Sequence, residues 1–228
     1  MEVLPYLDSV LISLSLFLML GYHANLWHSF KTKPLHTSIG IDALRRKFWF
    51  QGIKEGDDKK GMLAVQSLRN TLMATILTAQ IAILITLAMG ALMNNAYKGS
   101  HIFKSAIFGS QSGRIFALKY GSASIFLLVS FFCSSVALGF LTDANFMVNA
   151  WGDDQFSYRA HTQSIFERGF TLALIGNRSL CMSFPMLLWM FGPLPVALAS
   201  VALVWGLYEL DFAGKSTRSE SNLVSVGN

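Results

Sequence analysis

Charged residues are scarce in this sequence. Asp, Glu, Lys and Arg make up 14% of its 228 residues, whereas they account for about a quarter of an average soluble domain. Hydrophobic residues make up 53%, and they are concentrated in four runs that contain almost no charge. Each run is close to or above the roughly 20 residues that cross about 30 Å of hydrocarbon as a helix. This composition excludes an ordinary soluble domain and predicts an all-α polytopic membrane protein.

Cysteine is also scarce. The chain has only Cys133 and Cys181, and it contains no C-x-x-C pair, which excludes a disulfide framework. The N-terminus lacks a Lys/Arg segment and a clear small-residue cleavage site. We therefore expect the first apolar run to be a retained span rather than a cleaved signal.

Motifs that carry chemistry are missing as well. The GSQSG run at 109–113 lacks the Gly-Lys-Ser/Thr of a phosphate loop. The acidic residues between Glu55 and Asp58 lack the alternating oxygen ligands and terminal Glu of an EF-hand. His23 and His28 are five residues apart and so do not share a helical face, and His23 has no partner at membrane depth for a haem. We predict no catalytic residue, no cofactor-binding residue and no metal site.

The apolar runs predict four transmembrane helices with interfacial amphipathic helices, in one membrane domain over residues 1–213. Tyr6, Tyr22 and Trp27 are typical of interfacial anchors around the first span. A proline-containing segment, Gly192 to Pro195, is expected to kink the fourth span, and residues 152–179 are expected to form an interfacial or partly re-entrant helix. The tail, residues 214–228, is predicted to be disordered. The predicted spans are residues 4–26, 71–97, 116–142 and 180–208.

The loop after the first span is the most basic part of the chain. Within residues 31–60, Ile41, Leu44 and Phe48 alternate with the basic run Arg45 to Lys47, a pattern typical of a helix lying on a membrane surface. The net charge of +5 would suggest nucleic acid for a soluble protein. Because the basic residues here flank spans, we expect the lipid bilayer and its anionic head groups as partners, and no nucleic acid.

A polar collar precedes the second span. Gln66, Arg69 and Asn70 are three or four residues apart and share one helical face, which continues as Thr71, Thr75, Thr78 and Ala82. We expect this stripe to pack closely against other spans and to form interhelical hydrogen bonds. Arg69 is predicted to turn inward and to pair with an acidic side chain at the end of span three or in the following segment. The predicted collar residues are Gln66, Arg69, Asn70, Asp143 and Glu167.

The third span carries small residues at helical spacing, which predicts another close helix contact. Ser130 and Ser134 form a small-xxx-small pair, and Lys119 near the start of this span is expected to snorkel towards the head groups. The expected contact residues are Ala123, Leu127, Ser130, Ser134 and Ala137.

Four spans place both termini on one side of the membrane. The first and third loops then carry twelve Lys and Arg, against six on the side of the termini. The positive-inside rule therefore predicts that both termini lie outside the cytosol. The stretch Arg218-Ser-Glu-Ser221 resembles a kinase site and argues for a cytosolic tail, but a four-residue match is weaker than the charge bias.

Several sequence blocks resemble those of the plant members of domain-of-unknown-function family 599. The resemblance covers roughly residues 5–213 and implies a four-span membrane protein, with no catalytic residue or ligand to transfer. Its most specific block surrounds Gln66 and Arg69, whereas Ser179 and Cys181 stand where bulkier residues are expected. The blocks are Lys33-Pro-Leu35, Ile39-Gly40, Asp58-Lys-Lys60, Ala64 to Thr71, Ala117-Leu-Lys-Tyr120, Gly176-Asn-Arg178, Leu188 to Pro193 and Tyr208-Glu-Leu-Asp-Phe212.

Two functions from different classes follow. The first is a non-enzymatic integral membrane protein of the plasma membrane or an endomembrane, acting through helix packing and through lipid or protein contacts, with a second copy or another membrane protein as partner. The alternative is a small channel or transporter subunit, suggested by the Thr stripe and the proline-containing fourth span. An ion path requires charged residues deep within a span, and the four predicted spans contain none. We therefore favour the first function.

Overall fold

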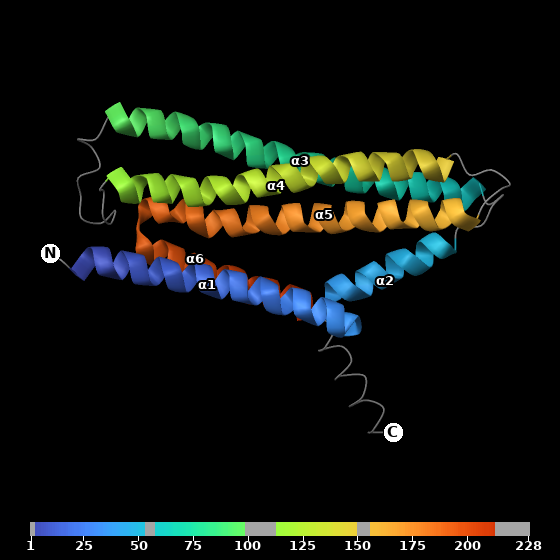
Figure 1. Cartoon of the computed structure of the whole chain (residues 1–228), viewed down its shortest axis with the longest axis horizontal. Helices are drawn as coiled ribbons and strands as arrows, with labels where there is room; N and C mark the ends of the chain where they lie inside the picture. Colours follow the sequence, from blue (N-terminus) through green and yellow to red (C-terminus); the bar gives the residue numbers. More distant parts are fainter. Residues whose placement is uncertain (1–2, 53–57, 99–112, 150–155, 213–228) are drawn as a thin grey trace, which may run out of the picture. The chain divides into compact units, whose positions relative to one another are not determined.

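The computed structural model describes residues 3–52, 58–98, 113–149 and 156–212, and within these ranges the chain is helical with no strand (Figure 1). The all-α prediction is confirmed for these residues. The predicted tail and the acidic residues at 55–57 lie outside them. The elements are α1 (Val3–Thr32), η1 (Pro34–His36), α2 (Ser38–Gln51), α3 (Asp58–Lys98), α4 (Gly113–Asn149), α5 (Phe156–Leu188), η3 (Trp189–Phe191) and α6 (Pro193–Phe212).

Five of these helices are long and apolar enough to cross a membrane, one more than predicted. The difference lies in the last third of the chain. The predicted interfacial helix and the first part of the predicted fourth span form one continuous helix, α5, and the rest of that span is a separate helix, α6. The predicted span at 180–208 is therefore wrong, because the chain breaks near its middle.

The break has a local cause. Gly192 has φ 128°, a conformation that favours glycine, and Pro193 and Pro195 follow it. Proline lacks an N–H, which suits a first helical turn but not a helix interior, so α6 starts at Pro193 instead of continuing α5. α5 itself was missed because His161, Glu167 and Arg168 dilute its apolar pattern.

The chain forms two compact units. The first contains α1, η1, the first part of α2, η3 and α6. In this unit α1 and α6 pack side by side and run in the same direction (Figure 1). Two spans that run in the same direction require an odd number of crossings between them. Three long helices, α3, α4 and α5, lie between α1 and α6 in the sequence, and this odd number is compatible with five spans.

The second unit contains the end of α2 and the helices α3, α4 and α5, in which successive long helices alternate in direction (Figure 1). The central helix, α4, buries one stripe whose positions alternate by three and four residues, the heptad spacing of left-handed helix packing. The five contact residues predicted for span three are all fully buried, which confirms that prediction. The stripe consists of Tyr120, Ala123, Leu127, Ser130, Ser134, Ala137, Leu141, Ala144 and Val148.

Two glycines of α5 let its backbone approach α4. A Cβ at Gly176 would lie 2.5 Å from the Ser134 Oγ and 3.1 Å from the Ser130 carbonyl oxygen. A Cβ at Gly169, seven residues earlier, would lie 2.9 Å from the Leu141 side chain. Small residues therefore set the α4–α5 distance, as in other tightly packed membrane helices.

Candidate functional site

The connection between α1 and α2 is a tightly built turn. Pro34 starts η1, because the fixed φ of proline suits a first helical position. Thr37 is fully buried and caps α2: its Oγ1 accepts a hydrogen bond from the Gly40 N–H at 3.2 Å, and its carbonyl accepts one from the Ile41 N–H at 3.0 Å. These bonds satisfy donors that the start of a helix otherwise leaves free.

Gly40 is required by the closeness of this turn. A Cβ at Gly40 would overlap the backbone of Pro34, which cannot rotate away. The Pro34 carbonyl also accepts hydrogen bonds from the N–H of Thr37 at 3.2 Å and from its hydroxyl at 3.3 Å. The blocks Lys33-Pro-Leu35 and Ile39-Gly40, which carry part of the family resemblance, therefore form one structural turn.

The last turn of α6 contributes a buried carboxylate to the first unit. Asp211 is 2% exposed, and its Oδ2 accepts a hydrogen bond from the Tyr22 hydroxyl at 2.6 Å. A carboxylate near a helix C-terminus opposes the helix dipole, and burial removes its hydration, so it needs strong donors. Tyr22 supplies one. The Tyr22 ring is buried and its hydroxyl is directed at Asp211, and the predicted place of Tyr22 at the membrane interface stays a prediction.

A second polar contact joins α6 to the start of α2. The Ser38 hydroxyl donates to the Leu210 carbonyl at 2.8 Å and satisfies one of the acceptors that a helix end leaves free. The His23 ring packs edge-on against Tyr22 with ring centroids 5.3 Å apart, and its Nδ1 lies 2.8 Å from the Met19 carbonyl oxygen. We call the group formed by Tyr22, Thr37, Ser38 and Asp211 the α1–α2–α6 junction.

Beyond the junction, α2 carries a surface that is both aromatic and basic. Phe48 is 68% exposed and Trp49 is 39% exposed, and Arg45 and Lys47 are exposed beside them. Phe50, the next residue, is buried and belongs with the end of α2 to the second unit, where it packs against Phe166 with ring centroids 5.1 Å apart. The prediction of a helix in this basic loop is confirmed, and its position on a membrane surface stays a prediction.

Charge on α2 is only weakly paired within the helix. Arg45 Nη1 lies 4.0 Å from Asp42 Oδ1, and both side chains are mostly exposed, so this ion pair contributes little to stability. The neighbouring Arg46 is partly buried. Burial lowers the pKa of its guanidinium, and the Asp42 carboxylate acts in the opposite direction. The exposed cations of α2 are thus available to an anionic partner.

The structure places the polar collar on an exposed face. Gln66, Arg69 and Asn70 are all exposed on α3, and so are Asp143 on α4 and Glu167 on α5. Glu167 accepts a hydrogen bond from the Gln163 amide at 2.7 Å. Within the described ranges, Arg69 forms no ion pair with Asp143 or Glu167. The inward-turned pair that we expected is therefore absent from this structure, and the role of the collar stays a prediction.

The Thr stripe below the collar packs closely but does not bond across helices as expected. Thr75 and Ala82 are buried against neighbouring helices of the second unit. The hydroxyl of Thr75 donates to the Thr71 carbonyl at 2.8 Å, and those of Thr71 and Thr78 donate to carbonyls four residues earlier in the same helix. Because these hydroxyls donate to carbonyls of α3 itself, they form no hydrogen bond to another helix among the described residues. The main contribution of the stripe is that its small side chains let α3 pack closely against its neighbour.

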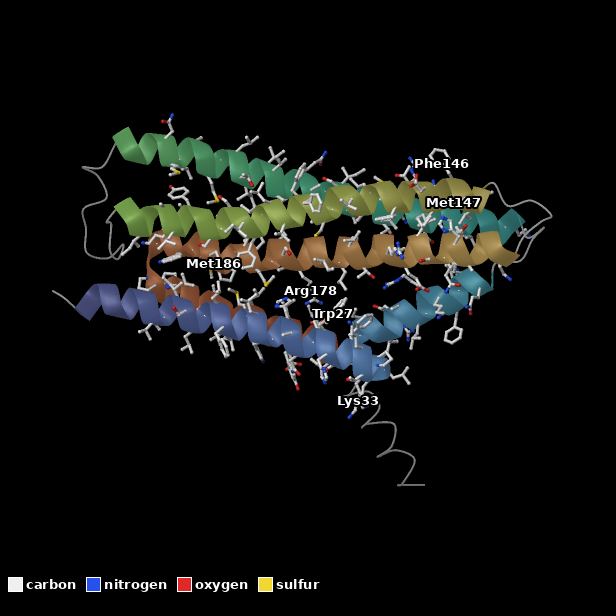
Figure 2. All side chains as sticks on the ribbon, viewed as in Figure 1. Trp27, Lys33, Phe146, Met147, Arg178 and Met186 are labelled. Atoms are coloured by element: carbon white, nitrogen blue, oxygen red, sulfur yellow. The ribbon has the colours of Figure 1, made fainter. Side chains whose placement is uncertain are left out.

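Three charged residues lie within the long apolar helices in surroundings that the sequence did not predict. Asp211 is buried in α6, and Lys119 is 4% exposed in α4 instead of snorkelling as predicted. Arg178 is half-buried in α5, ten residues or about 15 Å before the end of that helix at Leu188. Figure 2 shows its position along α5. Arg178 was placed in the interfacial helix because the extent of α5 was not recognised.

Within the described parts of the chain, no group of three or more His, Cys, Asp or Glu residues could hold a metal ion. The chain belongs to the family described as "Protein of unknown function, DUF599", whose sequence model matches residues 10–216. No curated protein and no solved structure matches the chain. The five long apolar helices support a multi-pass membrane protein, and the family description assigns no activity.

Proposed function

We propose that this protein is a five-span integral membrane protein that acts through contacts rather than chemistry, with α2 as a surface for anionic lipid. The observation that carries this proposal is the exposed pair Phe48 and Trp49 beside the exposed cations Arg45 and Lys47. Aromatic rings favour the head-group region of a bilayer, and each cation near an anionic surface contributes on the order of 1 kcal/mol. The α1–α2–α6 junction fixes the start of this helix.

Five spans change the expected orientation. The 31–60 loop, the segment between α4 and α5 and the C-terminal tail then share one side, with ten Lys and Arg, and the other side has three, Lys98, Lys104 and Arg114. The positive-inside rule places the N-terminus outside and the C-terminus in the cytosol. This orientation also puts Arg218-Ser-Glu-Ser221 on the cytosolic side, where protein kinases act, so the conflict in the four-span prediction disappears.

The lipid contact is tested with the full chain reconstituted in nanodiscs. We expect anionic lipid to be enriched in the lipid that co-purifies with the protein. The double change Arg45→Gln and Lys47→Gln should reduce that enrichment. Lys98→Gln, at the opposite end of α3, is the matched control and should leave it unchanged. Equal lipid composition for all three proteins would contradict the proposal.

A second candidate function is a channel or transporter subunit, and the charged residues within the long helices favour it. Ionisable residues inside membrane spans often mark ion or proton paths. Asp211 and Lys119 are buried, and Arg178 is half-buried far from either end of α5. Proteoliposomes should then show ion or proton flux that Asp211→Asn abolishes. Flux at the level of empty liposomes would leave only the first function.

A further inference from the structure

We propose that two copies of this protein pair in the membrane through the exposed face of α3, with Gln80 of one copy hydrogen-bonded to Gln80 of the other. This inference rests on the membrane placement proposed above. It concerns a face of α3 opposite to the one that packs on α4.

Gln80 is a polar side chain in an apolar setting. It is exposed, and it lies eleven residues, or about 16 Å, beyond the nearest charged residue of the same helix, Arg69. Within the described ranges, no side chain or carbonyl is hydrogen-bonded to its amide. Hydrocarbon offers no hydrogen bonds, so an amide facing lipid at this depth is unfavourable and gains by meeting a polar partner.

The positions around Gln80 repeat with heptad spacing. Counting from Gln66 to Asn94, exposed residues recur alternately after four and three residues, which is the spacing of a helix seam that faces another helix. Amides occupy four of these positions: Gln66, Asn70, Gln80 and Asn94. Gln66, Gln80 and Asn94 follow one another at 14 residues, or two heptads, so they fall at the same place in the repeat. Gln66 and Asn70 of the polar collar are thereby part of the proposed contact between copies.

Large apolar side chains fill the seam between the amides. Met73, Leu77, Leu84 and Leu87 are each between 56% and 65% exposed. The seam that packs on α4 lies on the other side of α3 and includes Ala64, Thr75 and Ala82, so the two seams do not compete. α3 thus has two packing faces, and within the second unit only one of them is covered.

A second copy of the protein fits the second seam, because the Gln80 amide carries both donors and an acceptor and can pair with its own equivalent. All copies of one protein enter the membrane with the same orientation, so a two-fold axis stands along the membrane normal and pairs α3 with α3 in parallel. Parallel heptad seams bring identical positions opposite each other. An amide carries both donors and an acceptor, so Gln80 can satisfy Gln80 of a second copy, as a single polar residue does in many coiled coils.

Cysteine cross-linking of the full chain in membranes tests this pairing. Cys133 and Cys181 are first changed to Ser, and single cysteines are introduced as Leu77→Cys, Gln80→Cys and Leu84→Cys. Oxidation should give a covalent dimer at each of these positions. Leu128→Cys on α4, where the native side chain is 56% exposed, is the matched control and should stay monomeric.

A second measurement uses the uncross-linked protein in detergent. Gln80→Leu replaces the amide with an apolar side chain at an exposed site, so the fold of the monomer should persist. The dissociation constant of the dimer is measured for the parent protein and for Gln80→Leu. Removal of one interhelical hydrogen bond of this kind should raise that constant roughly 3- to 30-fold. Thr78→Val, whose hydroxyl bonds within its own helix, should leave the constant unchanged.

Each result of these experiments either supports or overturns the pairing. Dimer at the three seam positions, none at Leu128, and weaker association of Gln80→Leu support the pairing. Absence of cross-links at the seam, or equal cross-linking at Leu128, overturns it while the protein stays membrane-embedded. Alkaline carbonate extraction is run in parallel. A chain that this treatment releases from membranes would overturn the membrane placement itself and the pairing with it.

Discussion

The two units hold their helices together in different ways. Between α4 and α5 the contact consists of small side chains and glycine, and Gly176 brings one backbone against the other. Between α1 and α6 the contact includes a directed hydrogen bond from Tyr22 to a buried carboxylate, Asp211. The first contact depends on shape and tolerates little added volume. The second depends on chemistry, and a substitution that keeps its shape can still break it.

This difference fits what each unit has to hold. Three long helices give the second unit many small contacts, and dispersion over a long stripe of mostly small side chains stabilises it. The first unit has two long helices and the turn that starts α2, so a few polar bonds fix the register of α6 against Tyr22 and Ser38. Added side-chain volume should therefore destabilise the second unit more than the first. Removal of a polar group should destabilise the first unit more than the second.

Added volume at Gly176 should have the largest effect. In Gly176→Leu, the new side chain starts 2.5 Å from the Ser134 Oγ and 3.1 Å from the Ser130 carbonyl oxygen, and the carbonyl cannot rotate away. The free energy of unfolding should fall by at least about 3 kcal/mol, the upper end of typical overpacking costs. Thermal unfolding of the detergent-solubilised protein measures this change.

Gly139→Leu on α4 is the control for Gly176→Leu. Nothing lies within 4 Å of a Cβ at Gly139, so its new side chain has room. The melting temperature of this variant should stay close to that of the parent protein. Equal destabilisation of the two variants would show that shape does not hold α4 and α5 together.

Removal of the Tyr22 hydroxyl should have the next largest effect. Tyr22→Phe keeps the ring but takes a donor from the buried Asp211 carboxylate. Hydrogen bonds to charged groups contribute about 1.5 to 3 kcal/mol, and we expect a loss of this size in the same unfolding measurement. Combining Tyr22→Phe with Asp211→Asn should cost less than the sum of the two single changes, because both remove one interaction.

Tyr208→Phe is matched to Tyr22→Phe. Tyr208 is on the same helix as Asp211 but is 48% exposed, so loss of its hydroxyl should change the unfolding free energy by less than about 0.5 kcal/mol. Comparable losses for the two Tyr variants would contradict a specific role for the Tyr22–Asp211 bond.

A smaller effect of opposite sign is expected at the serines. The Ser134 Oγ is buried without a hydrogen-bond partner among the described residues, so Ser134→Ala removes an unsatisfied polar atom. We expect stability to rise by about 1 kcal/mol. Ser200 is also fully buried, but its hydroxyl donates to the Val196 carbonyl at 2.7 Å, and Ser200→Ala should lower stability. Stability changes of the same sign for both variants would contradict this contrast.

The sequence predicted well what depends on local spacing. The buried stripe of α4 was recognisable because Ala123, Ser130 and Ala137 recur at helical intervals within an uncharged run. The helix in the basic loop was recognisable from the alternation of aromatic and basic residues. Each of these patterns is contained in one stretch of chain, where the period of a helix relates sequence to surface.

Contacts across the chain could not be predicted in this way. Tyr22 and Asp211 are 189 residues apart, and each alone is typical of a residue at the membrane interface. The break at Gly192 depends on a backbone conformation that a Gly-Pro pair permits but does not require. The amides of α3 did leave a signal, because Gln66 and Gln80 are two heptads apart, and a search for heptads among polar residues would have found it.

The smallest effect is expected at Arg69. The collar pattern predicts a partly buried ion pair, and the loss of such a pair would cost about 3 to 5 kcal/mol. The structure shows Arg69 exposed on the side of α3 away from α4, and exposed substitutions outside such pairs change stability by less than about 0.5 kcal/mol. Arg69→Leu and Lys59→Leu, two exposed positions on the same helix, should therefore give equal yields of folded protein in detergent. A much lower yield for Arg69→Leu would mean that the guanidinium finds an acidic partner in the membrane after all, and Asp143→Asn should then reproduce the loss.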